Sequence, residues 1–353
     1  MATIGKTDYT PLVRLLRTPT LLSGLTAEEL SHVIDLAYLA RLSGWLLGNI
    51  DVRVDVSRLP PWLSNRVLAM RLTVTEWDRS LRWEIDRVTR ALSDVDMTAV
   101  LLKGGAYLAA GLPPGSGRRV ADLDIMVPEA RLADAERALL AHGWQYQVLT
   151  DYDATYYRQW MHELPPLQHT ERKSILDLHH AILPKTSRLH PDPARLLAHA
   201  VTTSSGSRVL SPAHMVLHAA AHLFHDGEIA GAIRDLVDLD GLLRHFSTDA
   251  EFWPTLIREA QVLQLTRPAF YAIHHARKML NTPIPAEALH QIEAWAPPKP
   301  VGWLMDGLIE RAVQGEDRPS ASFSAFALYA RSHWLKMPPF MLGRHLFRKA
   351  FLS

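Results

Sequence analysis

The spacing of hydrophobic positions divides the chain into three parts. In residues 1–95 the spacing is helical: an apolar segment follows Thr26-Ala-Glu-Glu29, which fits a helix-capping box, and a longer amphipathic run extends from about Pro61 to Ser93. Residues 96–190 contain short apolar runs typical of strands, and residues 191–353 return to helical spacing. We therefore expect an N-terminal helical region, an α/β core and a C-terminal helical domain with these bounds.

The middle part carries the strand pattern. Apolar runs predict strands at 96–103, 120–127, 144–149 and 174–183, and a helix from Pro128 to His142 ends at Gly143. Strands interleaved with a few helices predict a small mixed sheet. The expected fold class is α+β, with helical regions before and after the sheet.

Asp122 and Asp124 lie within one of these apolar runs, Val120-Ala-Asp-Leu-Asp-Ile-Met-Val127. Side chains alternate across a strand, so both carboxylates point to one face. Two buried like charges repel, and a divalent cation with oxygen ligands relieves that repulsion. The alternative is an exposed acidic edge with no ligand.

A glycine turn precedes this strand. Lys103-Gly104-Gly105 joins an expected strand to a short helical stretch that continues to Ala110. Glycines at such a turn let the backbone approach a phosphate, and a helix N-terminus favours an anion. The order is therefore a phosphate cradle followed by a metal-binding strand.

That order resembles the DNA polymerase β-like nucleotidyltransferase superfamily, although Lys103 stands where most members have an apolar residue. The fuller string, Leu-Lys-Gly, then Arg, then Asp-Leu-Asp-Ile-Met-Val, resembles a narrower bacterial group, the uncharacterised nucleotidyltransferase family. The specific likeness covers about residues 96–183. It implies a third carboxylate on a later strand, and Asp177 is the best candidate. An edge strand with a solvated Asp177 is the alternative, and His179, on the same face, is interpreted as a hydrogen-bonded structural residue.

The resemblance implies a metal-dependent nucleotidyltransferase that moves NMP from an NTP to an unidentified acceptor hydroxyl and releases pyrophosphate. Asp122, Asp124 and Asp177 would be catalytic and would bind Mg²⁺ or Mn²⁺. The residues expected at the nucleotide are Lys103, Gly104, Gly105, Arg118 (with Arg119 as the alternative) and Arg234. Arg234 is also an i, i+4 neighbour of Asp238, and these two side chains could simply pair with each other.

Three other functions stay open. The same metal pair could serve a transferase of another phosphate-linked group, such as a sugar from a nucleotide-sugar, or the chain could be a non-catalytic nucleotide-binding module. A metalloenzyme built on a helical stripe of histidines is the third; the stripe is His214, His218, His222 and His225. We expect this stripe to line a cleft and to contact either the substrate or the nucleotidyltransferase core.

Composition limits the class of protein and its cellular location. The chain has 353 residues with 48% hydrophobic and 21% charged residues, as in folded globular proteins, and a net charge of +1 gives no clear nucleic-acid signal. It has no cysteine, which excludes disulfides and thiolate sites. We see no secretory leader and no transmembrane segment, and expect a cytoplasmic protein. The basic, aromatic tail from Tyr329 to Leu352 is expected to be a docked amphipathic helix, with contact to a membrane surface or an acidic partner as the alternative.

Overall fold

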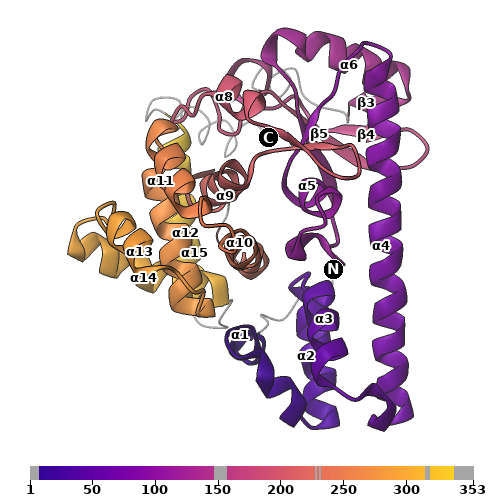
Figure 1. Ribbon diagram of the computed structural model, residues 1–353, viewed down its shortest axis with the longest axis vertical. Coiled ribbons are helices and arrows are strands. Elements are labelled where there is room, and N and C mark those ends of the chain that lie inside the picture. The colour runs from indigo at the N-terminus through magenta and orange to yellow at the C-terminus, as the bar shows by residue number, and fades with distance from the viewer. Residues whose placement is uncertain (1–7, 147–156, 227–228, 230–231, 315–318, 338–353) are drawn as a thin grey trace.

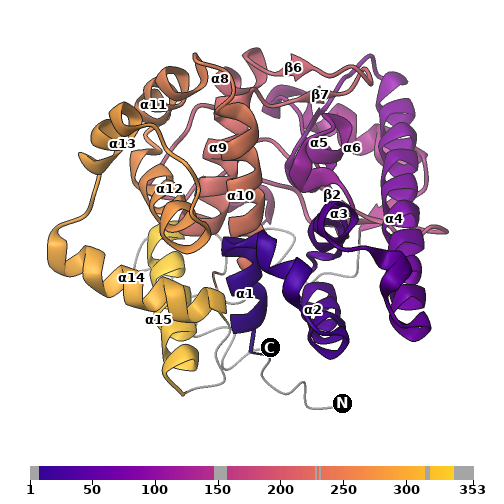
Figure 2. The same cartoon turned by 60° about the horizontal axis from the view of Figure 1, so that its bottom comes forward.

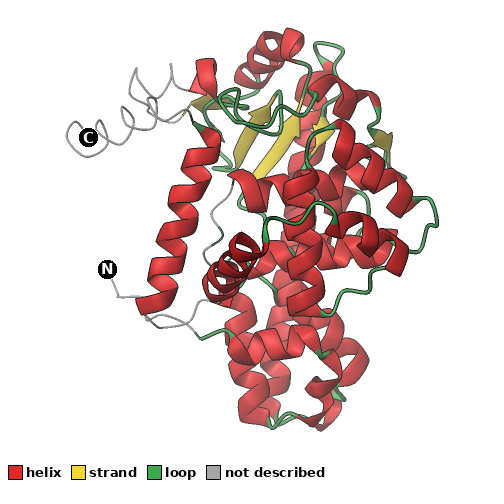
Figure 3. Cartoon of the chain, turned by 90° about the vertical axis from the view of Figure 1, so that its left-hand side faces the viewer, coloured by secondary structure: helices red, strands yellow, loops and turns green. Residues whose placement is uncertain are grey.

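The structure of the protein is a computed structural model. It describes residues 8–146, 157–226, 229, 232–314 and 319–337. It has mixed α and β structure, with one seven-stranded sheet and helices at both ends of the chain. None of the described helices is both long and apolar enough to cross a membrane. In Figure 3 the strands lie in the upper part of the molecule and helices make up the rest.

The N-terminal helices form one end of the molecule, and one long helix, α4, runs from them along the side of the sheet (Figure 1). Thr26 and Glu29 make the expected capping box, because each side chain accepts the other's backbone N–H. The apolar segment that follows is two helices rather than one, since Arg41 adopts a left-handed φ of 58° between them. The helices are α1 (Thr10–Arg17), α2 (Ala27–Leu39), α3 (Ser43–Arg53) and α4 (Pro61–Ser93).

The sheet has the strand order β3-β4-β5-β2-β1-β7-β6. Its centre is the parallel pair β2–β5, and β1 pairs antiparallel with β2 and parallel with β7. The strands are β1 (Val100–Leu101), β2 (Asp122–Met126), β3 (Trp144–Tyr146), β4 (Leu167–His169), β5 (Ile175–His179), β6 (Val201–Thr202) and β7 (Arg208–Val209).

Helices α4 and α5 (Lys103–Ala109) lie on one face of the sheet, and α9 (Pro212–Ala221) lies on the other. Short α5 places Gly105 against Leu123, so α5 lies on the face of β2 that carries Leu123 and Ile125. Helix α4 packs on that face as well, since it shares a pocket with Ile125. On the opposite face, α9 brings His218 near Lys103, His179 and Asp124. The two aspartates of β2 point to this second face.

The helices after residue 250 pack beyond α9, away from α4, whereas α6 packs against α4 (Figures 1 and 2). One π-helical turn, η5 (His222–Asp226), contacts α12 (Thr266–Leu280) through aromatic stacking. The ring of Phe224 stacks on those of Tyr271 and His275, with centroids 6.1 and 5.8 Å apart. The other helices are α6 (Leu132–Ala141), α8 (Pro193–Ala198), α10 (Ile233–Phe246), α11 (Phe252–Val262), α12 (Thr266–Leu280), α13 (Ala286–Glu293), α14 (Lys299–Gln314) and α15 (Pro319–Lys336).

Some expected boundaries differ from the observed ones. Strand β1 has two residues rather than the eight from 96 to 103, and the sheet continues past residue 190 through the β6–β7 hairpin, where we expected only helices. Such short strands leave no periodic signal in the sequence. The division into three domains therefore stays a prediction. Residues 147–149 of the expected strand and the tail from residue 338 lie outside the described residues.

Candidate active site

The parallel register of β2 and β5 brings two carboxylates together. Asp124 is the direct partner of Asp177, and Met126 is the partner of His179. Asp124 is almost fully buried, with 3% of its surface exposed. Alternation along each strand therefore places Asp124, Asp177 and His179 on one face, as the sequence pattern predicts. Ligand atoms of these three residues lie within 4.8 Å of one another.

Asp122 lies on the same side of β2 but in a different environment. It is half-buried at the start of the strand, opposite Ile175, at the edge of a pocket of about 360 Å³ that also contains Arg119. Its charge is close enough to raise the pKa of Asp177 and of Lys103, as one of the weaker contributions to each. The aspartate pair is thus asymmetric: Asp124 is enclosed, whereas Asp122 is half-buried and lines a pocket together with Trp77 and Trp83 of α4.

Asp124 is held by two cationic or hydrogen-bonding partners. Lys103 Nζ lies 2.7 Å and His179 Nε2 2.9 Å from the same oxygen, Asp124 Oδ1. Burial alone would raise the pKa of Asp124, but Lys103 and His179 outweigh it and hold that pKa well below its ordinary value. Asp124 is therefore ionised at neutral pH, and His179 is hydrogen-bonded to it; the structural role given to His179 stays a prediction.

Asp177 has the opposite electrostatics. Burial, together with the charges of Glu163 and Asp124, raises the pKa of Asp177 to about 8. Its Oδ1 atom is buried and has no hydrogen-bond partner within the described part of the chain. A buried carboxylate oxygen without a partner is costly, and a cation held between it and Asp124 would satisfy it. Carboxylate oxygens are also the ligands that Mg²⁺ prefers, so these residues fit a magnesium ion.

Glu163 is a member of this cluster that the sequence did not indicate. An isolated antiparallel bridge pairs it with His179, and its Oε2 atom lies 3.3 Å from His179 Nε2. Glu163 also forms, with His162 and His179, a second group whose ligand atoms lie within 4.8 Å of one another. A single bridge leaves no periodic pattern along the chain, so local spacing does not indicate Glu163. The one signal in the sequence is an acidic residue directly before Leu164-Pro-Pro.

The glycine turn lies beside the cluster, but its strain is not at the glycines. Lys103, the first residue of α5, has a left-handed φ of 43°, whereas Gly104 and Gly105 do not. A Cβ atom on Gly104 would lie 2.6 Å from Arg118 Nε, and one on Gly105 would lie 2.8 Å from Leu123 Cδ1. Both glycines are therefore required for close approach. Lys103 carries a backbone conformation that costs about 1–3 kcal/mol, as is common at functional sites.

Each arginine expected at the nucleotide is paired with an acidic residue of α10. Arg118 is buried, forms an ion pair with Asp238 and lies over the ring of Tyr107. Burial, and then Arg234, lowers the pKa of Arg118 to about 10. Arg234 Nη2 donates to Asp235 Oδ1 at 2.8 Å, so the suggested Arg234–Asp238 pair is wrong: Asp238 is taken by Arg118.

The histidine stripe has separate contacts rather than one shared ligand. His214 Nε2 hydrogen-bonds Glu259 Oε2 at 2.9 Å, and His225 Nε2 lies 2.8 Å from Ser187 Oγ. His218 is buried close to the carboxylate cluster; burial, then Lys103, holds its pKa well below the ordinary value, so the ring is neutral. No group of potential metal ligands in the described residues includes a stripe histidine. His218 therefore lies beside the core, as expected for the stripe, whereas His214 contacts α11 instead.

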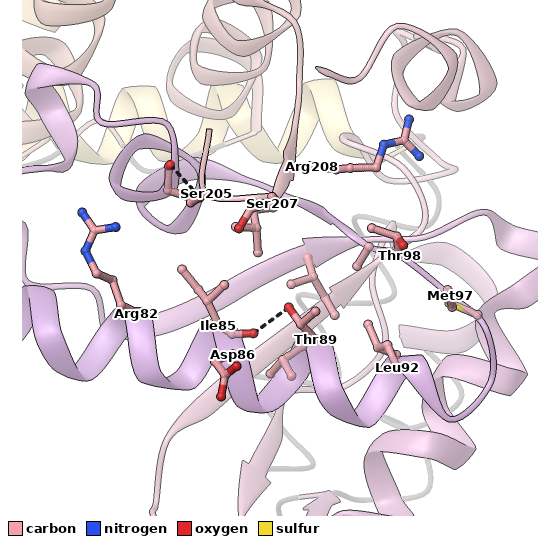
Figure 4. Close-up of a pocket in the computed structure, with 16 residues that line it drawn as sticks. Arg82, Ile85, Asp86, Thr89, Leu92, Met97, Thr98, Ser205, Ser207 and Arg208 are labelled. Carbon is pink, nitrogen blue, oxygen red and sulfur yellow. Dashed lines mark hydrogen bonds between the residues drawn. The ribbon is translucent and has the colours of Figure 1, made fainter. Parts of the chain in front are cut away.

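A separate pocket of about 370 Å³ lies on the other face of the sheet (Figure 4). Ile85 and Thr89 of α4 form one side, and Ser205 and Ser207 of the β6–β7 turn form the other. Leu101 and Ile125, from the back of the central strands, also line it. None of the carboxylates of the cluster reaches this pocket, which therefore does not belong to the candidate active site.

Comparisons with known proteins identify the family of the chain. None of the curated proteins matches it. Among solved structures it is similar to JHP933 from Helicobacter pylori, with 13% identity, a TM-score of 0.32, and coverage of 73% of this chain and 96% of that one. The sequence model of a family described as uncharacterised nucleotidyltransferase matches residues 26–281, which include β1 to β7, α9 and α10. The chain belongs to this uncharacterised nucleotidyltransferase family.

Proposed function

We propose that the protein is a magnesium-dependent nucleotidyltransferase that transfers NMP from an NTP to an acceptor hydroxyl. In this reaction the acceptor oxygen bonds to the α-phosphorus, the bond from that phosphorus to the β-phosphate oxygen breaks, and pyrophosphate leaves. The hydroxyl proton passes to solvent. Membership of the family supports the reaction class, and the carboxylate cluster supports its location.

One observation carries the proposal: Asp124 and Asp177 lie side by side with opposite electrostatics. Asp124 is kept ionised by Lys103 and His179, whereas Asp177 has a raised pKa and one oxygen with no partner in the described part of the chain. A purely structural cluster would pair both carboxylates. We assign this cluster to a hard cation, with Asp122, at the start of the same strand, as a further ligand.

Bound Mg²⁺ would polarise the α-phosphate and lower the pKa of the acceptor hydroxyl. Lys103 restricts Asp124 to one orientation, because its ammonium lies 2.7 Å from Oδ1. The same ammonium adds a positive charge beside the triphosphate. The N–H groups of Gly104 and Gly105, in the first turn of α5, are assigned to the β- and γ-phosphates.

The two arginines are assigned different roles in the reaction. Arg118 fills the space that a side chain on Gly104 would occupy, and it is paired with Asp238. We therefore give Arg118 a positioning role, in which it fixes α5 against α10. Arg234 is paired with Asp235 and only partly buried. It remains the candidate for contact with the nucleotide from α10.

The test uses α-labelled NTPs with Mg²⁺ and measures both NTP binding and transfer of label to co-encoded proteins and metabolites. We expect binding to require Mg²⁺ and transfer to disappear in Asp124→Asn. Asp35→Asn, an exposed carboxylate on α2, is the matched control and should behave as the wild type. Mg²⁺-independent binding, or full transfer by Asp124→Asn, would contradict the proposal.

A further inference from the structure

A second cluster of metal-ligating side chains lies between α12 and α14, away from the carboxylate cluster. It consists of His274 and His275 on α12 and Asp306 on α14. In Figures 1 and 2, α9 lies between α12 and the sheet, so this cluster is separate from the candidate active site. Nothing in the proposed transfer reaction uses these residues.

His275 is the observation that requires an explanation. It is completely buried, with 0% of its surface exposed, and neither ring nitrogen has a hydrogen-bond partner within the described chain. Its Nε2 atom lies 3.7 Å from Asp306 Oδ1, which is too long for a hydrogen bond. An imidazole buried without a partner costs free energy, so such groups are rare in folded proteins.

Aromatic rings fix the plane of this imidazole. Phe224 stacks on His275 with ring centroids 5.8 Å apart and an angle of 16°, and Tyr271 stacks at 6.4 Å and 19°. The ring therefore cannot turn freely to seek another partner. Burial, then the charge of His274, lowers the pKa of His275 to about 3. The ring is neutral near pH 7, which is the form that binds a metal.

The ligand atoms converge at the spacing that a small metal ion needs. His274 Nε2 lies 3.0 Å from Asp306 Oδ1, and all three ligand atoms lie within 4.8 Å of one another. Tetrahedral bonds of about 2.0–2.1 Å separate ligand atoms by roughly 3.3 Å. The outer oxygen, Asp306 Oδ2, accepts a hydrogen bond from Lys278 Nζ at 2.8 Å, which orients the carboxylate as outer partners of metal ligands do.

We propose that His274, His275 and Asp306 bind a divalent transition metal of the Zn²⁺ class and thereby fasten α14 to α12. Two imidazoles and one carboxylate suit Zn²⁺ rather than Mg²⁺, which prefers oxygen ligands only. Water completes the coordination. The ion gives the partnerless nitrogen of His275 a ligand role and replaces the close His274–Asp306 hydrogen bond by two metal bonds.

The experiment counts Zn²⁺ bound to the full chain by equilibrium dialysis after chelator treatment, with excess Mg²⁺ present. We expect His274→Ala and Asp306→Asn each to remove one bound equivalent. The loss of affinity should exceed about 100-fold, since even the outer partner of a ligand is worth 10–100-fold. His290→Ala, an exposed histidine on α13, is the control and should bind as the wild type.

Two further measurements separate a metal site from a merely structural cluster. Co²⁺ bound to the wild type should give the intense visible absorption of a tetrahedral site, and this band should be absent in His274→Ala. His275→Phe keeps the ring stack, so it should remain folded and still lose the equivalent. Equal Zn²⁺ binding by the wild type, His274→Ala and Asp306→Asn would overturn the proposal, whatever the state of nucleotidyl transfer.

Discussion

At the scale of single residues, the buried Oδ1 atom of Asp177 has no hydrogen-bond partner among the described residues, and this burial costs free energy. Asp177→Asn should therefore stabilise the metal-free protein while it abolishes transfer. The sign follows from the raised pKa: the unfolded chain releases this proton near pH 4, the folded chain only near pH 8, so ionisation weakens the wild type in between. The gain at pH 8 should be on the order of 1–3 kcal/mol.

Urea unfolding at pH 5 and pH 8, with chelator present, measures this effect. The gain should be larger at pH 8 than at pH 5, where the folded wild type keeps the proton. Asp35→Asn should show no such dependence on pH. A loss of stability in Asp177→Asn at pH 8 would mean that the carboxylate has a favourable partner, and the electrostatic argument for a cation would fail.

Gly104 offers a second residue-scale prediction. Gly104→Ala puts a Cβ atom 2.6 Å from Arg118 Nε and 2.7 Å from Val120 Cγ2, so it should destabilise the fold by about 1–3 kcal/mol through overpacking. In Gly302→Ala, on α14, the new Cβ atom meets only an ordinary contact at 3.6 Å. That variant should gain about 0.5–1 kcal/mol. Denaturant midpoints of the two variants should move in opposite directions; equal shifts would contradict the close approach.

At the scale of elements, Glu259 of α11 joins α8 and α9. Arg195 donates two hydrogen bonds of 2.7 Å to its carboxylate and His214 donates one of 2.9 Å. Arg195 first, with His214 and against burial, lowers the pKa of Glu259 to about 2 from an ordinary 4.5. The stability that this carboxylate provides is complete above pH 4.5 and is lost as the pH falls through 2.

Glu259→Gln should therefore lower the free energy of unfolding by about 1–2 kcal/mol at pH 7. The difference from the wild type should shrink between pH 4.5 and pH 2, because both proteins then lack the charge. Denaturant unfolding across this pH range is the measurement. A difference that stays constant with pH would show that the geometry of the hydrogen bonds, and not the charge of Glu259, joins the three helices.

The elements that could be predicted from the sequence are those with a regular spacing of apolar or polar residues along the chain. The capping box at Thr26, the long helix α4 and the same-face pair Asp122 and Asp124 follow from local spacing. Local spacing cannot predict partners that are distant in sequence. Glu163 reaches the cluster by one bridge and Arg118 is paired through α10, so both required the tertiary fold.

At the scale of the whole molecule, the division into three domains has a direct test. A fragment of residues 96–190 lacks β7, the parallel partner of β1, and α9, which covers the carboxylate face. We expect it not to unfold cooperatively, whereas a fragment of residues 26–281 should. Thermal melts followed by circular dichroism distinguish the two. A sharp transition in the shorter fragment would show that the predicted core is an independent domain.

The pairing of β2 with β5 also has a consequence for how the protein folds. Asp124 and His179, which share a hydrogen bond, are 55 positions apart in the chain. Contacts of such long sequence separation close late, because the intervening loop must first lose its entropy. A nascent or partly folded chain therefore has no cation site, even when both strands have been synthesised. Under the proposed function, the affinity for Mg²⁺ should therefore appear only with the last cooperative step of folding, once the sheet is closed.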